Sequence, residues 1–136
     1  MDANTKLSII KTLSDLNKNG ITFIYITHDI GTLKYFEARI AVMYKGELVE
    51  VGNLKESLDN PLHPYLKLLL NKDDYNINEN KSGVLESEDN INSNNFRACV
   101  FYFRCKYAAN KCKVEKPLLK IHQSRFVACH LFNDYQ

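Results

Sequence analysis

The stretch "ITFIYITHDI", residues 21–30, decides the fold that the sequence predicts. From Ile21 to Thr27 nearly every residue is apolar, which is the pattern of a strand covered on both faces in a parallel sheet. The run then ends abruptly in Thr27, His28 and Asp29, so the predicted strand carries a titratable imidazole at its carboxyl end. A histidine in this position fits a capping or solvated side chain as well as a functional group.

An amphipathic helix is predicted over residues 2–19, directly before this strand. Its apolar residues recur near three-residue spacing, at Leu7, Ile10, Leu13 and Leu16. Asn4 or Thr5 is the expected N-cap, and Gly20 stands where a left-handed C-cap residue is expected.

Further elements are predicted downstream of the strand. A short helical segment follows Asp29, and residues 40–44 and 47–51 form a hairpin around a turn at Lys45 and Gly46. The stretch "NPLHPYLKLLL" predicts a helix opened by Pro64. Helices and strands alternate, so the predicted fold class is α/β. With one central parallel strand, this part of the chain is too short to close its own sheet.

Composition divides the chain of 136 residues into three parts. Residues 1–70 are rich in apolar side chains, residues 71–95 form a polar and acidic linker, and residues 96–136 are basic and hold all the cysteines. A net charge of +2 is too mild to indicate nucleic acid, so no such partner is expected. No apolar run is long enough to cross a bilayer, and the amino terminus lacks the layout of a signal peptide.

Four motifs in the head of the chain carry a resemblance to a known family. Asp2 matches the aspartate of a D-loop, His28 followed by aspartate matches a switch histidine, Arg39 follows at its usual place, and "NPLHPY" spans residues 60–65. In this order they resemble the carboxy-terminal half of the ATP-binding subunit of an ABC transporter, of the oligopeptide/dipeptide importer type. The predicted architecture is therefore part of an ABC ATPase nucleotide-binding domain with a small cysteine-rich, metal-binding tail.

The resemblance implies roles for two residues. His28 would hydrogen-bond the γ-phosphate of ATP and help to position the attacking water as a catalytic residue, and Asp2 would join it in the nucleotide site with Mg²⁺. The sequence contains no phosphate loop, no signature loop and no acidic pair for magnesium, and Asp2 is expected to follow that pair closely. We therefore expect no ATP hydrolysis by this chain unless an amino-terminal half complements it.

The cysteines are separated by five, six and sixteen residues, at Cys99, Cys105, Cys112 and Cys129. This spacing is wider than that of zinc ribbons or ferredoxins and is by itself a moderate signal. The segment resembles the carboxy-terminal segment of the same importer subunits, some of which hold a [4Fe-4S] cluster. By that resemblance the four cysteines are the expected metal ligands, and the cluster is favoured over zinc.

Other interpretations of this tail stay open. Four buried cysteines without a ligand would satisfy the sequence as well. Basic residues at Arg104, Lys106 and Lys111 would offset the charge of a four-thiolate site. We expect His122 and His130 to be non-ligands, since His130 follows Cys129 directly and adjacent residues rarely reach one metal together.

Three hypotheses follow for the whole chain. The first is the carboxy-terminal portion of an importer ATP-binding subunit, located in the cytoplasm at the inner face of the cell membrane. Its partners would be transporter membrane subunits, a second ATP-binding subunit and a separate amino-terminal half. The second is a non-enzymatic module that binds iron-sulfur or zinc, and the third is an inactive remnant. The transported substrate does not follow from the sequence.

Overall fold

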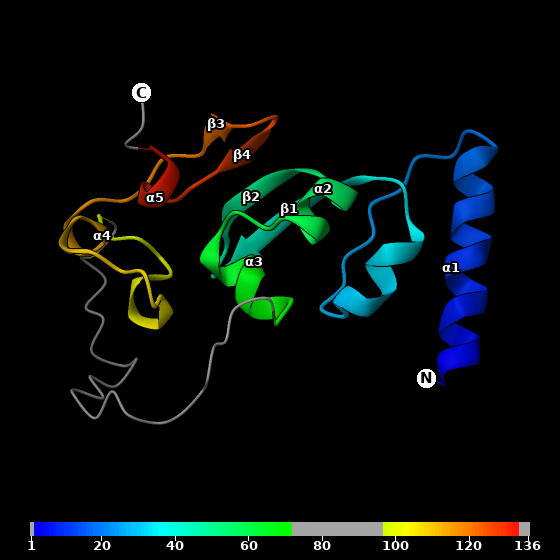
Figure 1. Ribbon diagram of the computed structural model, residues 1–136. Helices are drawn as coiled ribbons and strands as arrows, with labels where there is room; N and C mark the ends of the chain where they lie inside the picture. Colours follow the sequence, from blue (N-terminus) through cyan, green and yellow to red (C-terminus); the bar gives the residue numbers. More distant parts are fainter. Residues whose placement is uncertain (1, 72–96, 134–136) are drawn as a thin grey trace. The chain divides into compact units, whose positions relative to one another are not determined.

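The computed structural model describes residues 2–71 and 97–133 (Figure 1). It contains two compact units, Met1–Ala38 and Arg39–Gln136. Among the described residues, no helix is both long enough and apolar enough to cross a membrane.

The first unit begins with helix α1, Ala3–Lys18. Its N-cap is Asp2, whose Oδ1 accepts the backbone N–H of Thr5 at 2.7 Å, so the prediction of Asn4 or Thr5 as cap is wrong. Asp2 is the N-cap because its carboxylate accepts a hydrogen bond from an otherwise unpaired backbone N–H at the positive end of the helix. The same hydrogen bond holds the pKa of Asp2 below its ordinary value.

The predicted left-handed glycine at the other end of α1 is confirmed. Gly20 has φ +90°, and its N–H donates to the carbonyl of Asn17 at 2.9 Å. The N–H of Ile21 donates to the carbonyl of Leu16 at 3.1 Å. These two bonds satisfy the last carbonyls of the helix and turn the chain sharply into the next segment.

Residues 21–27 form no strand, so the predicted parallel strand is wrong for the described part of the chain. A strand is held by hydrogen bonds to neighbouring strands, and no strand of the described residues pairs with this segment. Ile24 and Ile26 are accordingly 90% and 91% exposed. On the other side, the ring of Tyr25 packs on Phe36 with centroids 5.1 Å apart.

The short helical segment predicted after Asp29 is confirmed as a 3₁₀ helix, η1, Ile30–Tyr35. The carbonyl of Asp29 accepts the N–H of Thr32 at 3.2 Å and its hydroxyl at 2.7 Å. The carboxylate of Asp29 accepts a hydrogen bond from the ammonium of Lys6 at 2.8 Å, and this ion pair connects η1 to α1. This hydrogen bond lowers the pKa of Asp29 and raises that of Lys6.

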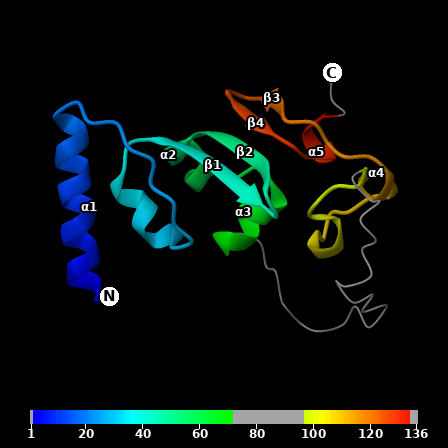
Figure 2. The ribbon, with the colours of Figure 1, turned by 180° about the vertical axis from the view of Figure 1, so that it is seen from behind.

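The second unit is built on one antiparallel sheet of four strands (Figure 2). Its strands are β1, Arg39–Tyr44; β2, Glu47–Asn53; β3, Lys120–His122; and β4, Arg125–Val127. Their order is β1-β2-β4-β3, so β4 from the cysteine-rich end pairs with β2. The sheet therefore joins residues from both sides of the polar linker.

The hairpin predicted from β1 to β2 is confirmed. Lys45 and Gly46 both have positive φ, 46° and 81°, as a tight two-residue hairpin turn of the type I′ class requires. The register then shifts, because Met43 pairs with Leu48 whereas Val42 pairs with Glu50. The extra residue between them is a β-bulge, and it leaves a glutamate buried in the strand.

Short helices surround this sheet. They are α2, Leu54–Asp59; α3, Pro64–Leu69; η3, Tyr102–Arg104; α4, Asn110–Val114; and α5, His130–Asn133. The predicted start of a helix at Pro64 is confirmed. The main apolar core consists of Val42, Tyr44, Val49, Leu66 and Phe101. Phe101 lies against Tyr44 edge to face, at 5.1 Å between centroids, and carries the cysteine-rich segment onto the sheet.

Gly52 provides a test of this packing. A methyl group there would meet the Cγ, Cδ and Cβ atoms of Arg125 inside the sheet. We expect Gly52→Ala to lower the free energy of unfolding by about 1 to 3 kcal/mol, as other overpacked cores do. Urea unfolding measures this. Gly31→Ala is the matched control, since its methyl meets only the side-chain Oδ1 of Asp29, at 3.3 Å. Equal losses in the two variants would contradict the proposed packing.

Candidate functional site

The four cysteines line one cavity of about 390 Å³ in the second unit. Cys99 and Cys105 flank η3, Cys112 lies within α4, and Cys129 directly precedes α5. The cavity also has an aromatic and basic lining, which includes His63, Phe101, Tyr102, Tyr107, Lys111 and His130. The four cysteines, which are spread over about thirty positions of sequence, thus share a single site.

Backbone hydrogen bonds fix the loops that carry these cysteines. The N–H of Cys99 donates to the carbonyl of Cys112 at 2.8 Å, so two of the cysteine-bearing segments are joined directly. The carbonyls of Cys99 and Cys105 close turns by accepting the N–H groups of Tyr102 and Ala108, at 3.1 and 3.2 Å. The cysteines are therefore held by local turns rather than by long regular elements.

The cysteines are free thiols, and Cys129 is buried while the other three are half-buried. Among the residues that the structure describes, no three His, Cys, Asp or Glu side chains converge on one point that could hold a single metal ion. A [4Fe-4S] cluster sets a different requirement, because its four thiolate ligands bind four separate irons rather than one metal ion.

Burial favours the neutral form of Cys99, Cys105 and Cys129. It raises the pKa of Cys129 to about 12, and it also raises the pKa of Cys99 and Cys105. The neighbouring cysteines act in the same direction, since a second thiolate in the cavity would repel the first. A cationic metal centre would reverse this preference by binding the thiolates directly.

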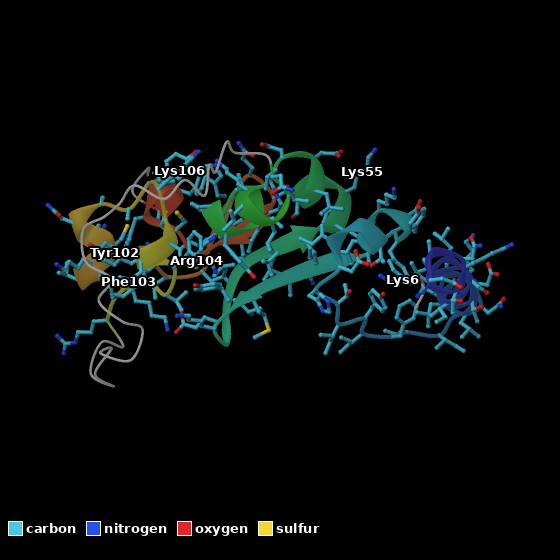
Figure 3. All side chains as sticks on the ribbon, turned by 90° about the horizontal axis from the view of Figure 1, so that it is seen from below. Lys6, Lys55, Tyr102, Phe103, Arg104 and Lys106 are labelled. Atoms are coloured by element: carbon cyan, nitrogen blue, oxygen red, sulfur yellow. The ribbon has the colours of Figure 1, made fainter. Side chains whose placement is uncertain are left out.

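The basic residues near the cavity lie in different places. Lys111 lines it. The guanidinium of Arg104 lies over the rings of Tyr44 and Phe101, at 5.9 and 6.0 Å, and the ammonium of Lys106 lies 5.1 Å from the ring of Tyr107. Figure 3 labels Arg104 and Lys106, which are the sequence neighbours of Cys105. Of these three cations, Lys111 is the one the structure sets at the cavity wall.

The histidines near the cavity are engaged in other contacts. His130 is hydrogen-bonded through Nε2 to the carbonyl of Glu115 at 2.8 Å, and the ring of His122 packs on Phe132 at 4.9 Å between centroids. His63 is 1% exposed, and its Nδ1 accepts the N–H of Tyr65 at 3.0 Å as the N-cap of α3. Burial lowers the pKa of His63 to about 4, against a smaller opposing hydrogen bond with Ala128.

A buried ion pair, which the sequence did not predict, supports one wall of the cavity. Glu50 and Arg125 are 0% and 2% exposed, and Nη1 of Arg125 donates to Oε1 of Glu50 at 2.9 Å. Oε2 of Glu50 accepts the N–H groups of Leu62 and His63, at 3.0 and 2.8 Å. A charged residue in the middle of the apolar strand "ELVEVG" is the signal that could have revealed it.

The predicted nucleotide-site residues lie in the first unit. Asp2 caps α1, and His28 is an exposed residue between residues 21–27 and η1. A cavity of about 300 Å³ lies between α1 and η1, lined among others by Lys6, Asp29 and Thr32. Asp2 and His28 are not among its lining residues.

Comparison with known proteins identifies the family that this chain resembles. Residues 49–112 match the family described as "Oligopeptide/dipeptide transporter, C-terminal region", and this range holds the "NPLHPY" turn and three of the four cysteines. Residues 49–112 carry the C-terminal region of the oligopeptide/dipeptide transporters. The resemblance inferred from the ordered motifs is confirmed.

The relatives are ATP-binding proteins. The oligopeptide transport ATP-binding protein AppF of Bacillus subtilis is 32% identical over 141 residues, which cover 98% of this chain and 42% of AppF. The dipeptide transport ATP-binding protein DppD of Caldanaerobacter subterraneus is 35% identical, with 98% and 42% covered. The oligopeptide transport ATP-binding protein OppF of Salmonella typhimurium is 33% identical, with 95% and 40% covered. The chain thus spans about two fifths of the length of these relatives.

The C-terminal region should lose stability in mild acid through His63. Its pKa is about 4 in the folded chain against an ordinary 6.5, so the unfolded chain takes up the proton first as the pH falls. We expect the free energy of unfolding to decrease between pH 6.5 and pH 4, by about 3 kcal/mol at most. Urea unfolding at several pH values measures the slope.

The variant His63→Asn keeps an N-cap acceptor but cannot titrate. It should flatten the stability profile in this pH window, whatever its effect on stability at pH 7. An unchanged slope in His63→Asn would assign the acid sensitivity to other groups.

Proposed function

We propose that this chain supplies the carboxy-terminal portion of the ATP-binding subunit of a peptide importer. The observation that carries the proposal is the extent of the sequence matches. Relatives named as ATP-binding proteins align with 95% to 98% of this chain, and the alignment takes up only 40% to 42% of their own length. The segment of residues 21–27 supports it: its residues are those of a strand buried in a parallel sheet, yet no strand of the described residues pairs with it, so its partner strands would have to come from elsewhere. The remaining three fifths of such a subunit would provide them.

In the completed subunit, His28 would contact the γ-phosphate of ATP and orient the attacking water, with Asp2 beside the nucleotide and Mg²⁺. Its exposure favours this role, because an imidazole that is not packed into the core is open to a phosphate brought by another part of the protein. A hydrogen bond to a charged group contributes roughly 1.5 to 3 kcal/mol. Positioning of this kind is most of what phosphoryl transfer requires from a protein.

The roles of His28 can be tested in a chimera. The full chain is fused behind the amino-terminal portion of AppF at the aligned position, which restores a subunit of full length. We expect ATP hydrolysis by the chimera and none by the chain alone. His28→Ala should lower kcat about 100-fold, as the loss of one transition-state hydrogen bond does elsewhere. The matched control is Lys11→Ala, an exposed change on α1. Turnover by the chain alone, or an unaffected kcat in His28→Ala, would contradict the proposal.

The second part of the proposal concerns the cysteines: Cys99, Cys105, Cys112 and Cys129 hold a [4Fe-4S] cluster. Its support is the shared cavity, which all four side chains line, together with the cationic side chain of Lys111 at its wall. Four thiolates are the usual ligand set of such a cluster, and nearby positive charge offsets theirs. When bound, the cluster would cross-link the three segments that carry its ligands.

Cluster binding is tested on protein purified without oxygen. We expect a broad absorbance shoulder near 400 nm, with about four irons and four sulfides per chain. Cys129→Ser should lose most of both, whereas His122→Gln, a polar change outside the cavity, should retain them. A content of one zinc and no iron per chain would contradict the cluster and indicate a structural zinc site instead. A metal-free chain that folds normally would leave four unliganded cysteines.

The remaining assignments follow from the first proposal. The completed subunit would lie in the cytoplasm against the inner face of the membrane and pair with membrane subunits and a second ATP-binding subunit. Residues 1–70 would belong to the ATPase domain, and residues 96–136 to the four-cysteine segment, on either side of the linker 71–95. An amino-terminal half supplied by a separate chain would serve as well as one joined covalently.

A further inference from the structure

One face of the sheet in the second unit is apolar and open to solvent. Its apolar part, which we define as the outer face, is formed by Ala41, Met43, Leu48, Val51, Ile121 and Phe126, and the exposed polar pair Arg39 and Asn53 borders it at the end opposite the hairpin turn. Four of its side chains are large and well exposed: Met43 at 55%, Leu48 at 42%, Ile121 at 70% and Phe126 at 41%.

The strand register shows that the outer face is continuous. Ala41 pairs with Val51, Val51 with Phe126, and Phe126 with Ile121, so one row of apolar side chains crosses all four strands. Met43 and Leu48 form a further pair at the hairpin end. Side chains alternate between the two faces of a sheet, and Val42, Arg125 and Val127, which are next to this row in sequence, are buried on the opposite face.

An antiparallel sheet with one solvated face normally carries polar side chains on that face. Here every paired position of the row is apolar. Large contiguous apolar patches on soluble domains mark interaction sites. A ligand of small size would need a concave pocket, whereas a flat sheet face fits another layer of protein structure.

We propose that the outer face docks the portion of the ATP-binding subunit that lies outside this chain. The inference rests on the proposed function, and it adds the surface through which the second unit would meet the rest of the subunit. The length of the relatives argues for this occupant, since about three fifths of each lies beyond the match. The apolar row calls for a partner surface that is itself apolar, rather than a charged one.

Met43 is a natural probe of the outer face. Hydrogen peroxide converts an exposed methionine to its sulfoxide, which mass spectrometry detects in the peptide that contains it. We expect Met43 to oxidise readily in the full chain and at least tenfold more slowly in the AppF chimera. Val114→Met places a second probe on α4, where residue 114 is 68% exposed, and this probe should oxidise at the same rate in both. Equal oxidation of Met43 in the chain and in a folded chimera would overturn the proposal.

Ile121→Glu adds a second readout. The charge should leave the thermal unfolding of the chain alone unchanged, because residue 121 is 70% exposed, but it should restore rapid oxidation of Met43 in the chimera. Protection of Met43 in the chain alone, with the mass of a dimer, would assign the face to a second copy and overturn the chosen occupant. Failure of chimeras with AppF, DppD and OppF to fold, while the chain alone folds, would also overturn it.

The outcomes separate this inference from the proposed function. A chimera that hydrolyses ATP while Met43 stays fully reactive would uphold the function and reject the docking surface. A folded chimera with protected Met43 and no hydrolysis would uphold the docking surface and reject the function.

Discussion

The second unit depends on one interaction, the buried ion pair between Glu50 and Arg125. The two oxygens of the carboxylate accept three hydrogen bonds, from Arg125 and from the backbone of Leu62 and His63. Arg125 also donates to the carbonyl of Asn60 at 2.8 Å. Strand β2, strand β4 and the turn before α3 are thus connected through a single pair of charges. Removal of one partner would leave the other charged in the core, which typically costs about 3 to 5 kcal/mol.

This network explains two features of the neighbouring sequence. The β-bulge at Val49 lets an extra residue enter β2, so Val49 and Glu50 are both buried. Gly52 then leaves room for the aliphatic part of Arg125. The same turn that Glu50 holds also places His63 at the wall of the four-cysteine cavity. Sheet, turn and cavity are therefore one packed system, although they arise from segments that are far apart in the sequence.

Local signals in the sequence predicted local structure well. The hairpin turn at Lys45 and Gly46, the glycine after α1 and the proline that opens α3 each have a conformational cause within a few residues. Prediction failed where the outcome depended on partners. Residues 21–27 have the composition of a buried parallel strand. The composition of a segment does not show whether strands are present to pair with it.

The candidate site shows the same division. The four cysteines could be selected from the sequence, whereas their common cavity depends on how η3, α4 and the residues after β4 come together in the fold. The ion pair escaped prediction, because its partners are 75 residues apart and nothing local marks Arg125 as buried.

Because Glu50 and Arg125 are 75 residues apart, they are synthesised at different times. During synthesis at about 5 to 20 residues per second, Glu50 leaves the ribosome roughly 4 to 15 s before Arg125. For that interval the β1–β2 hairpin exposes the edge of β2 and an uncompensated carboxylate. The charge then has a second use, since a glutamate on an open edge discourages pairing with other nascent chains until its own partner arrives.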